Sequence, residues 1–234
     1  MLQEIINAFA PARCVDCLCE DTWYCERCRA HAPIATQSCI ICKTERPRGT
    51  TCINCREETN ITGIVSVAPY SNHALQRGIE WLKFKGIRPI ADTLAGLIIP
   101  HLARIDSLDA LSRCAILVPI PLHKNKLRQR GFNQSEDVAK AISALCNIQL
   151  APILRRKKAT KSQAKLSHDE RPHNMHEAFE MAISKQEYSN IVARKPIIIL
   201  IDDVSTTGAT LMSASRAFPE LPDVKIWCAT IARG

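Results

Sequence analysis

The strongest signal in the chain is carried by Pro196-Ile-Ile-Ile-Leu-Ile-Asp202-Asp203-Val-Ser-Thr206-Thr207-Gly208-Ala-Thr210-Leu211. Residues 197–201 are all apolar and mostly β-branched, which predicts a strand buried on both faces, as in a parallel sheet. Two carboxylates end this strand, a hydroxyl-rich loop follows, and residues 212–217 predict a short helix. Because ligands of such sheets bind at the carboxyl ends of strands, this run is the first candidate for a binding site.

The loop after the strand is suited to a phosphorylated sugar. Backbone N–H groups of residues 206–210, at the start of a helix, would hold a phosphate, and the neighbouring hydroxyls would add donors. Asp202 and Asp203 would accept hydrogen bonds from a pair of vicinal hydroxyls. The alternative, a buried strand that ends in a polar turn, explains an Asp-Asp pair but is less specific than the whole pattern.

That whole pattern resembles the phosphoribosyl-diphosphate signature of type I phosphoribosyltransferases. The resemblance implies an α/β fold, a type I phosphoribosyltransferase-like parallel sheet flanked by helices, and a site for phosphoribosyl diphosphate with Mg²⁺. It implies that the acids hold the ribose hydroxyls and that the loop holds the 5′-phosphate. The binding residues implied are Asp202, Asp203, Val204, Ser205, Thr206, Thr207, Gly208, Ala209 and Thr210. Purine salvage enzymes of that family carry an acid where this chain has Thr206, so the resemblance disfavours oxopurine salvage.

Length and charge narrow the class of protein further. A chain of 234 residues holds one ordinary domain and a small appendage. No apolar run approaches the ~18 residues of a membrane span, and residues 1–11 lack the basic start and cleavage site of a secretory signal, which predicts a cytoplasmic protein. Residues 120–171 contain twelve Lys and Arg against four acids, so this segment carries the whole net charge of +8 and favours a polyanionic partner.

Nine of the twelve cysteines precede residue 56. Eight of them form four C-x-x-C knuckles: Cys14/Cys17, Cys25/Cys28, Cys39/Cys42 and Cys52/Cys55. Two knuckles complete a tetrahedral zinc site, so residues 1–58 are predicted to form a small Cys-rich, double zinc-ribbon head with two structural Zn²⁺ ions. Disulfides are the alternative, which the cytosolic context disfavours. Sequential pairing of the knuckles is the simpler arrangement, a cross-braced one stays open, and Cys19 is not expected to be a ligand.

Hydrophobic patterning assigns residues 59–234 to the sheet domain. Strands are predicted at 61–70, 114–120, 149–154 and 224–232, besides the strand before the acid pair. Helices are predicted at 73–86 and 89–99, and a third begins near Asn133 or Ser135, one of which would cap it. The core stripe of this third helix is Val138, Ala141, Ile142 and Leu145.

Three basic segments are candidates for contacts with a diphosphate or a nucleic acid. A loop predicted after the 114–120 strand offers Pro121, Leu122, His123, Lys124, Arg128, Arg130, Gly131, Phe132, Asn133 and Gln134. Lys83 and Lys85 end the first helix, and Arg155, Lys161 and Lys165 belong to a loop expected to order over a bound anion. For each segment the alternative is a solvated basic surface.

A narrower resemblance combines the cysteine knuckles, Trp81-Leu-Lys-Phe-Lys-Gly86, residues 121–134, a Thr160…Phe179 segment and the acid pair. Together these resemble the ComF family of bacterial competence proteins over nearly the whole chain. The resemblance implies cytosolic handling of single-stranded DNA during natural transformation and a helicase-like competence partner. An active phosphoribosyltransferase with an unidentified base or amine acceptor is the alternative. The sequence shows no residue that recognises a base and no obvious general base, so whether the protein is an enzyme stays open here.

Overall fold

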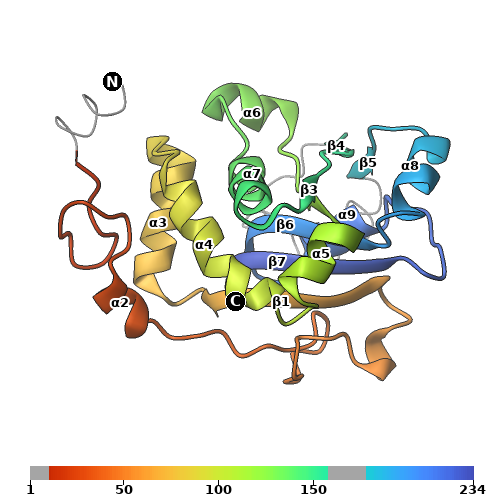
Figure 1. The fold of residues 1–234 in the computed structure, drawn as a ribbon, viewed down its shortest axis with the longest axis horizontal. Helices are drawn as coiled ribbons and strands as arrows, with labels where there is room; N and C mark the ends of the chain where they lie inside the picture. Colours follow the sequence, from red (N-terminus) through yellow and green to blue (C-terminus); the bar gives the residue numbers. More distant parts are fainter. Residues whose placement is uncertain (1–10, 158–177) are drawn as a thin grey trace, which may run out of the picture.

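The computed structural model describes residues 11–157 and 178–234 (Figure 1). Its centre is a five-stranded sheet in the order β1-β7-β6-β2-β3, in which every neighbouring pair is parallel. The strands are β1 (Ile61–Pro69), β2 (Ala115–Pro119), β3 (Gln149–Leu150), β6 (Ile197–Ser205) and β7 (Lys225–Arg233). The α/β fold class predicted from the sequence is thereby confirmed. The strand that carries the acid pair, β6, lies at the centre of the sheet and continues to Ser205, two residues beyond the expected end at the acids.

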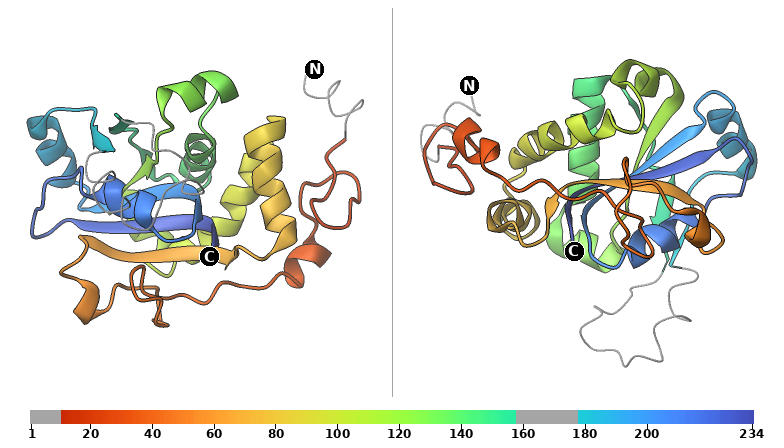
Figure 2. Two further views of the ribbon diagram at one scale, coloured as in Figure 1. Left: turned by 180° about the vertical axis from the view of Figure 1, so that it is seen from behind. Right: turned by 90° about the horizontal axis from the view of Figure 1, so that it is seen from below.

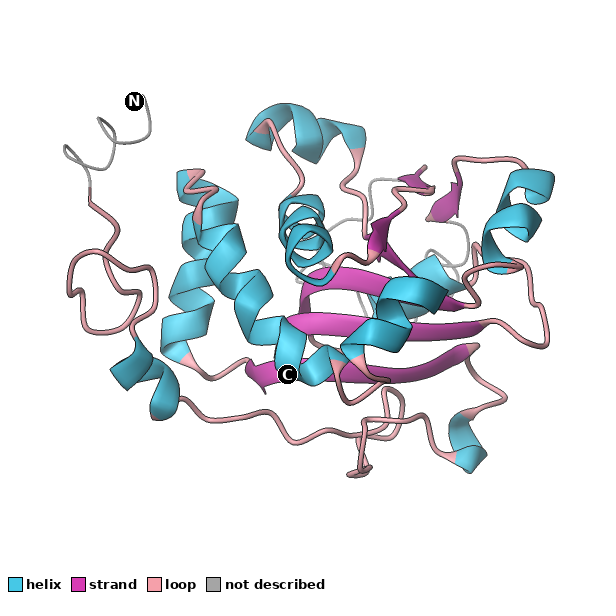
Figure 3. Ribbon diagram, viewed as in Figure 1, coloured by secondary structure: helices cyan, strands magenta, loops and turns pink. Residues whose placement is uncertain are grey.

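Helices cover both faces of this sheet (Figures 1 and 3). One face packs against α3 (His73–Lys85), α4 (Ile90–Leu102), α5 (Leu108–Cys114) and α7 (Gln134–Cys146). The other face packs against α8 (Lys185–Val192) and α9 (Ala209–Ser215). Within β6, Ile199 faces the first core and Leu200 the second. Burial on both faces explains why this strand has an unbroken apolar run.

The structure corrects several expectations about single elements. The expected 149–154 strand is split into β3 and a separate β4 (Leu154–Arg156), which pairs antiparallel with β5 (Phe179–Met181). The expected loop after β2 contains a helix, α6 (Lys124–Arg130). Leu145, expected in the core, is 60% exposed because it lies at the end of α7 beyond the packed stripe.

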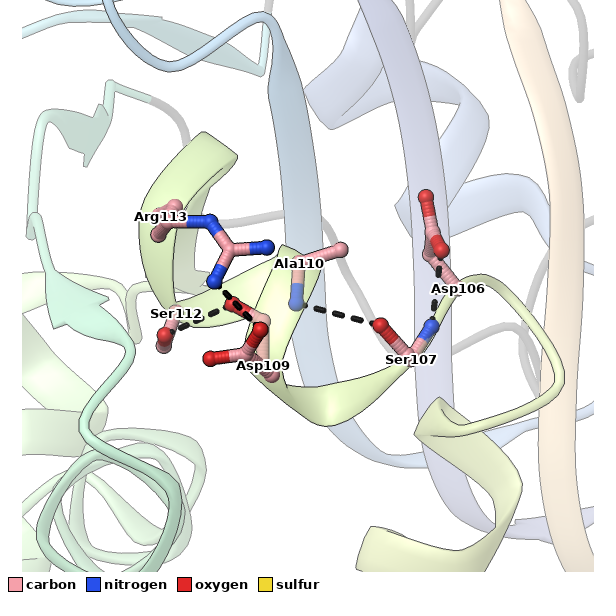
Figure 4. A network of polar contacts seen from close by, with 6 residues as sticks. All are labelled: Asp106, Ser107, Asp109, Ala110, Ser112 and Arg113. Carbon is pink, nitrogen blue, oxygen red and sulfur yellow. Dashed lines mark hydrogen bonds and ion pairs between the residues drawn. The ribbon is translucent and has the colours of Figure 1, made fainter.

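Two further short helices of the sheet domain, α5 and α8, are not predicted by the sequence, and local capping explains both. At the start of α5 the Ser107 hydroxyl accepts a hydrogen bond from the Ala110 N–H at 3.2 Å, and Arg113 pairs with Asp109 one turn later (Figure 4). The helix α8 begins with a capping box between Ser184 and Glu187. Each is about two turns long, which is too short for an apolar period to stand out in the sequence.

The cysteine-rich head lies along the sheet and contributes to its cores. It contains α2 (Glu26–Ala30) and a short 3₁₀ turn at Ile53–Cys55, and its chain runs beside β1 (Figure 2). The Ile64 N–H donates to the Gly49 carbonyl at 2.9 Å, so the head covers the free edge of β1. Val15 and Tyr24 join the core under α3 and α4, whereas Ile40 joins the opposite core.

No helix among the described residues has both the length and the apolar character required to cross a bilayer.

Candidate functional site

The acid pair lies at the carboxyl end of β6 and is held by three neighbouring groups. Asp202 and Asp203 are 8% and 4% exposed. The Ser135 hydroxyl and the Asp203 N–H both donate to Asp202 Oδ1, each at 2.9 Å. The ammonium of Lys83, near the end of α3, forms an ion pair with Asp203 Oδ2. Residues from β6, α3 and α7 therefore meet at one point, which is the sheet edge where parallel α/β proteins bind ligands.

Positive charges of two further elements, α6 and β4, act on Lys83 and on Asp202. Burial lowers the pKa of Lys83 to about 8, the Asp202 carboxylate raises it, and the charges of Arg130 and Lys126 on α6 lower it. Arg156 of β4 acts in turn on Asp202. Lys83 of α3 and Arg156 of β4 therefore act on the acid pair, and the α6 cations act on Lys83. Cations gathered in this way favour a ligand that carries negative charge.

The pKa of the Asp202 carboxyl is raised, and its burial and its neighbours account for this. Burial raises the pKa of Asp202 to about 6, while the Ser135 hydrogen bond and the charges of Lys83 and Arg156 lower it. The carboxylate form, which accepts hydrogen bonds from hydroxyls, is therefore lost as pH falls through about 6. The cationic form of Lys83 is lost as pH rises through about 8.

We expect ligand affinity at this site to peak between pH 6 and 8 and to fall on either side. Ser135→Ala removes a hydrogen bond that lowers the pKa of Asp202, so its acid limb should move to higher pH. Isothermal titration calorimetry from pH 5 to pH 9 measures both limbs. Ser143→Ala is the matched control, because Ser143 lies on the same helix and its hydroxyl donates to the Ile148 carbonyl and not to Asp202. An unshifted acid limb in Ser135→Ala would contradict this assignment.

The loop after β6 presents two hydroxyls to solvent and turns at a buried glycine. Thr206 and Thr207 are exposed, and Gly208 precedes α9 with a φ of +81°, in the left-handed region. The Ser205 hydroxyl is buried and has no hydrogen-bond partner among the described residues. A buried polar group without a partner costs stability, so it marks a position that a polar ligand would complete.

The residues proposed around α6 divide into two groups. Some hold the helix in place: the His123 ring accepts the Asn125 N–H, Asn133 Nδ2 donates to the Ile120 carbonyl at 3.0 Å, and Arg130 donates to Gln134. Others, Lys124 and Arg128, are exposed. Asn133 is the residue before α7 but its side chain does not cap the helix, and Ser135 bonds Asp202 instead, so the expected cap is wrong.

Aromatic side chains near α6 differ from the expectation. Phe132, the ring considered for base stacking, is half-buried against the core, with the Arg88 guanidinium 5.5 Å from its centre. Phe84 is 75% exposed at the end of α3, and the Arg130 guanidinium lies 5.5 Å from its ring centre. Lys85, by contrast, lies over Trp81. The ring offered to solvent beside the cations is therefore Phe84.

The second basic segment is only partly described. Arg155 and Lys157 both pair with Glu180 of β5, so neither of these charges is directed to the acid pair. The charge of Arg156, the next residue along β4, lowers the pKa of Asp202. Neighbouring residues of a strand point to opposite faces, so Arg156 points away from the side of Arg155 and Lys157. Lys161 and Lys165 lie outside the described residues. Sequence reasoning missed Arg156 and the role of Ser135. Only the alternation along β4 pointed to Arg156, and nothing local pointed to the hydrogen bond of Ser135.

The eight knuckle cysteines gather into two clusters with the geometry of zinc sites. The first contains Cys14, Cys17, Cys25 and Cys28, and the second contains Cys39, Cys42, Cys52 and Cys55. Within each cluster the sulfur atoms all lie within 4.8 Å of one another. The Cys17–Cys25 and Cys42–Cys52 sulfur pairs are each 3.7 Å apart, close to the ~3.8 Å edge of a tetrahedron with zinc–sulfur bonds of about 2.3 Å. The knuckles thus pair sequentially, and Cys19 belongs to neither cluster.

The fold and these sites define a class: a parallel-sheet α/β protein with an acid-pair site among cations and two tetracysteine clusters. No family model matches the chain. It is 30% identical over 180 residues to Competence protein F of Haemophilus influenzae, covering 75% of this chain and 76% of that protein. It is 27% identical over 168 residues to DNA utilization protein YhgH of Escherichia coli K12, covering 70% of each.

A third relative is Competence protein ComFC of Bacillus subtilis, 33% identical over 105 residues, which are 45% of this chain and 38% of that protein. The chain belongs to the ComF family of competence proteins.

Proposed function

We propose that this protein handles single-stranded DNA in the cytoplasm during natural transformation, and that its acid-pair site binds phosphoribosyl diphosphate with Mg²⁺. A competence role follows from the family, and the names of its relatives refer to competence and DNA utilization. The observation that carries the proposal is that α6, with its exposed cations, lies beside Phe84 and acts on Lys83, the ion-pair partner of Asp203. A helicase-like competence protein is the partner we propose for moving the strand.

The phosphoribosyl part of the proposal is supported by the donors and acceptors of the site. Carboxylates of Asp202 and Asp203 accept hydrogen bonds from vicinal hydroxyls and bind Mg²⁺, an oxygen-seeking ion. Thr206, Thr207 and the unpartnered Ser205 hydroxyl offer donors to a phosphate. The cations of α3, α6 and β4 offset the charge of the diphosphate group.

The DNA part is supported by the surface of α6. Proteins that bind single strands combine cations, which contact phosphates, with exposed aromatic rings, on which bases stack. Lys124, Lys126 and Arg128 are exposed on α6, and Phe84 is the adjacent exposed ring. Binding of this kind is weakly sequence-specific and falls steeply with salt.

The contributions of charge and of base stacking to DNA binding can be measured separately. Lys124→Gln/Arg128→Gln should weaken binding of a labelled oligothymidylate and reduce the slope of log affinity against log salt by about 1.4, since each lost phosphate contact changes the slope by about 0.7. Phe84→Leu should weaken binding by ~1–3 kcal/mol, the worth of one stacked base, and leave the slope unchanged. Fluorescence anisotropy at several salt concentrations measures both quantities.

The charge-matched control is Arg113→Gln/Arg194→Gln, because both side chains are exposed and lie where β2 and β6 begin, at the opposite edge of the sheet. This variant loses the same charge and should bind DNA as the wild type does. Equal losses in both double variants would show that net charge, and not α6, governs binding, and would contradict the proposed surface.

The second candidate function is a phosphoribosyltransferase, which the same acid pair and cations favour. Electrostatic stabilisation of a leaving diphosphate is the catalysis that such a site would supply. Release of diphosphate from phosphoribosyl diphosphate on addition of a nucleobase or amine, lost in Asp202→Asn, would favour the enzyme over the DNA handler.

A further inference from the structure

The second cysteine cluster lies directly against the loop that follows β6. Ile40, between the ligand positions Cys39 and Cys42, is fully buried. A Cβ atom added to Gly208 would lie 2.9 Å from Ile40 Cγ1, so only glycine permits this approach. The turn between Cys39 and Cys42 therefore packs directly against the loop at Gly208.

Two cationic side chains add polar links between the knuckle and the end of β6. Lys43 Nζ donates to the Thr206 carbonyl at 3.1 Å. Arg233, at the end of β7, donates to the Ser38 and Cys39 carbonyls at 2.7 and 2.8 Å. The next residue, Gly234, donates its N–H to the Ser205 carbonyl at 3.0 Å. The knuckle is thus bonded to the loop directly, through Lys43, and to the end of β7 beside the loop, through Arg233.

The other knuckle of this cluster is anchored elsewhere, on β1. The residue before Cys52, Thr51, donates its hydroxyl to the Ile61 carbonyl at 2.6 Å. Upstream, Gly49 approaches β1 so closely that a Cβ atom would lie 1.9 Å from the Ile64 carbonyl oxygen. A metal bound by all four thiolates joins the knuckle that touches the loop to the knuckle fixed on the sheet, which limits movement of the loop wall.

The first cluster makes different contacts. The carbonyl of Val15 accepts a hydrogen bond from Arg77 of α3 at 2.6 Å, and Trp23 packs edge-on against Trp81 at 6.2 Å. Both contacts are with α3 and neither is with the loop after β6. The two clusters can therefore be compared within one molecule.

We propose that metal in the second cluster (Cys39, Cys42, Cys52, Cys55) positions the 206–208 loop, through Ile40 and Lys43, for the phosphorylated ligand of the proposed function. Metal occupancy of this cluster and ligand binding at the loop are then thermodynamically coupled. Coupling of this kind is reciprocal: the metal raises the affinity for the ligand, and the bound ligand raises the affinity for the metal by the same factor.

Hydrogen exchange of the full chain tests the structural part without any ligand. Ile40→Ala, which keeps all the thiols, should speed exchange of amides 205–211 by about fivefold or more, the lower end of typical coupling, and leave amides 198–201 of β6 unchanged. Ile40→Val keeps the branched contact and should restore the wild-type exchange rate. Cys42→Ser should act like Ile40→Ala, whereas Cys17→Ser, in the first cluster, should leave loop exchange at the wild-type rate.

Zinc affinity tests the reciprocal part. In the Cys17→Ser background, which retains the second cluster intact, equilibrium competition with a zinc-selective chelator should show a zinc affinity at least about fivefold higher when phosphoribosyl diphosphate and Mg²⁺ are present. Calorimetry on the wild type shows separately whether that ligand binds, so a failure of the proposed function is seen there and leaves the exchange result valid. Unchanged loop exchange in both Ile40→Ala and Cys42→Ser overturns the coupling, as does equal loop exchange in Cys17→Ser and Cys42→Ser.

Discussion

Asp202→Asn/Asp203→Asn should lower the affinity for phosphoribosyl diphosphate with Mg²⁺ by about 10²–10⁴-fold. Each carboxylate is expected to accept a charge-assisted hydrogen bond from a ribose hydroxyl, worth ~1.5–3 kcal/mol, and two such bonds give that range. The loss should be visible in calorimetry at pH 7, where the Asp202 carboxylate is ionised because its pKa is raised only to about 6.

Removing Asp203 also leaves the Lys83 ammonium without its ion-pair partner, and this effect must be separated from the loss of a ligand contact. Lys83→Met/Asp203→Asn removes both partners and should bind the ligand more weakly than Lys83→Met alone if Asp203 contacts the ligand. Asp137→Asn is the matched control, since Asp137 is equally buried and bonds Arg88 at 2.7 and 2.8 Å. It should lose stability without losing affinity. Less than a tenfold loss in the double Asn variant would contradict the assignment of the site.

The parts of this site that the sequence predicts are those encoded in contiguous residues. The apolar run of β6, the acids that follow it and the glycine before α9 lie next to one another in the chain, so residues 196–211 predict both strand and site. The knuckle cysteines are likewise local pairs, and their spacing alone predicts metal-binding turns. Grouping the knuckles into two clusters, however, required the structure.

The parts that sequence reasoning missed depend on contacts between distant segments. Whether Arg155 or Arg156 points to the acid pair is determined by how β4 pairs with β5. The bond from Ser135 to Asp202 exists because α7 packs on β6, and the same residue was expected to serve only as a helix cap. The helix α6 was missed because it is short and has almost no apolar residues, so it has no hydrophobic period.

The contact between the head and the loop is of the same kind. Nothing in the local sequence links Ile40 to Gly208 or Lys43 to Thr206, although together these contacts seat the second cluster against the proposed ligand site. Since Val15 and Ile40 are buried in opposite cores of the sheet domain, the head is joined to that domain by apolar packing as well as by hydrogen bonds. Loss of metal should therefore lower the free energy of unfolding of the sheet domain as well as of the head.

Native mass spectrometry should find two zinc ions per chain, and their removal should lower the melting temperature substantially. Cys14 and Cys39 are fully buried members of the two clusters. Chelation would therefore leave their thiols without a metal partner inside the head. Structural zinc contributes folding free energy directly, and a loss of even ~4 kcal/mol would lower the melting temperature of a chain of this size by about 8–16 °C. Differential scanning calorimetry before and after chelation measures the shift.

Single cysteine variants show whether the ions occupy the two clusters. Cys17→Ser and Cys42→Ser should each retain one zinc ion, because each removes an exposed ligand from a different cluster. Cys19→Ser is the matched control: its thiol is exposed in the same head but belongs to neither cluster, so the variant should retain two ions and the wild-type melting temperature. Zinc lost from Cys19→Ser, or two ions kept by Cys42→Ser, would show that the metal is bound by a different set of thiols.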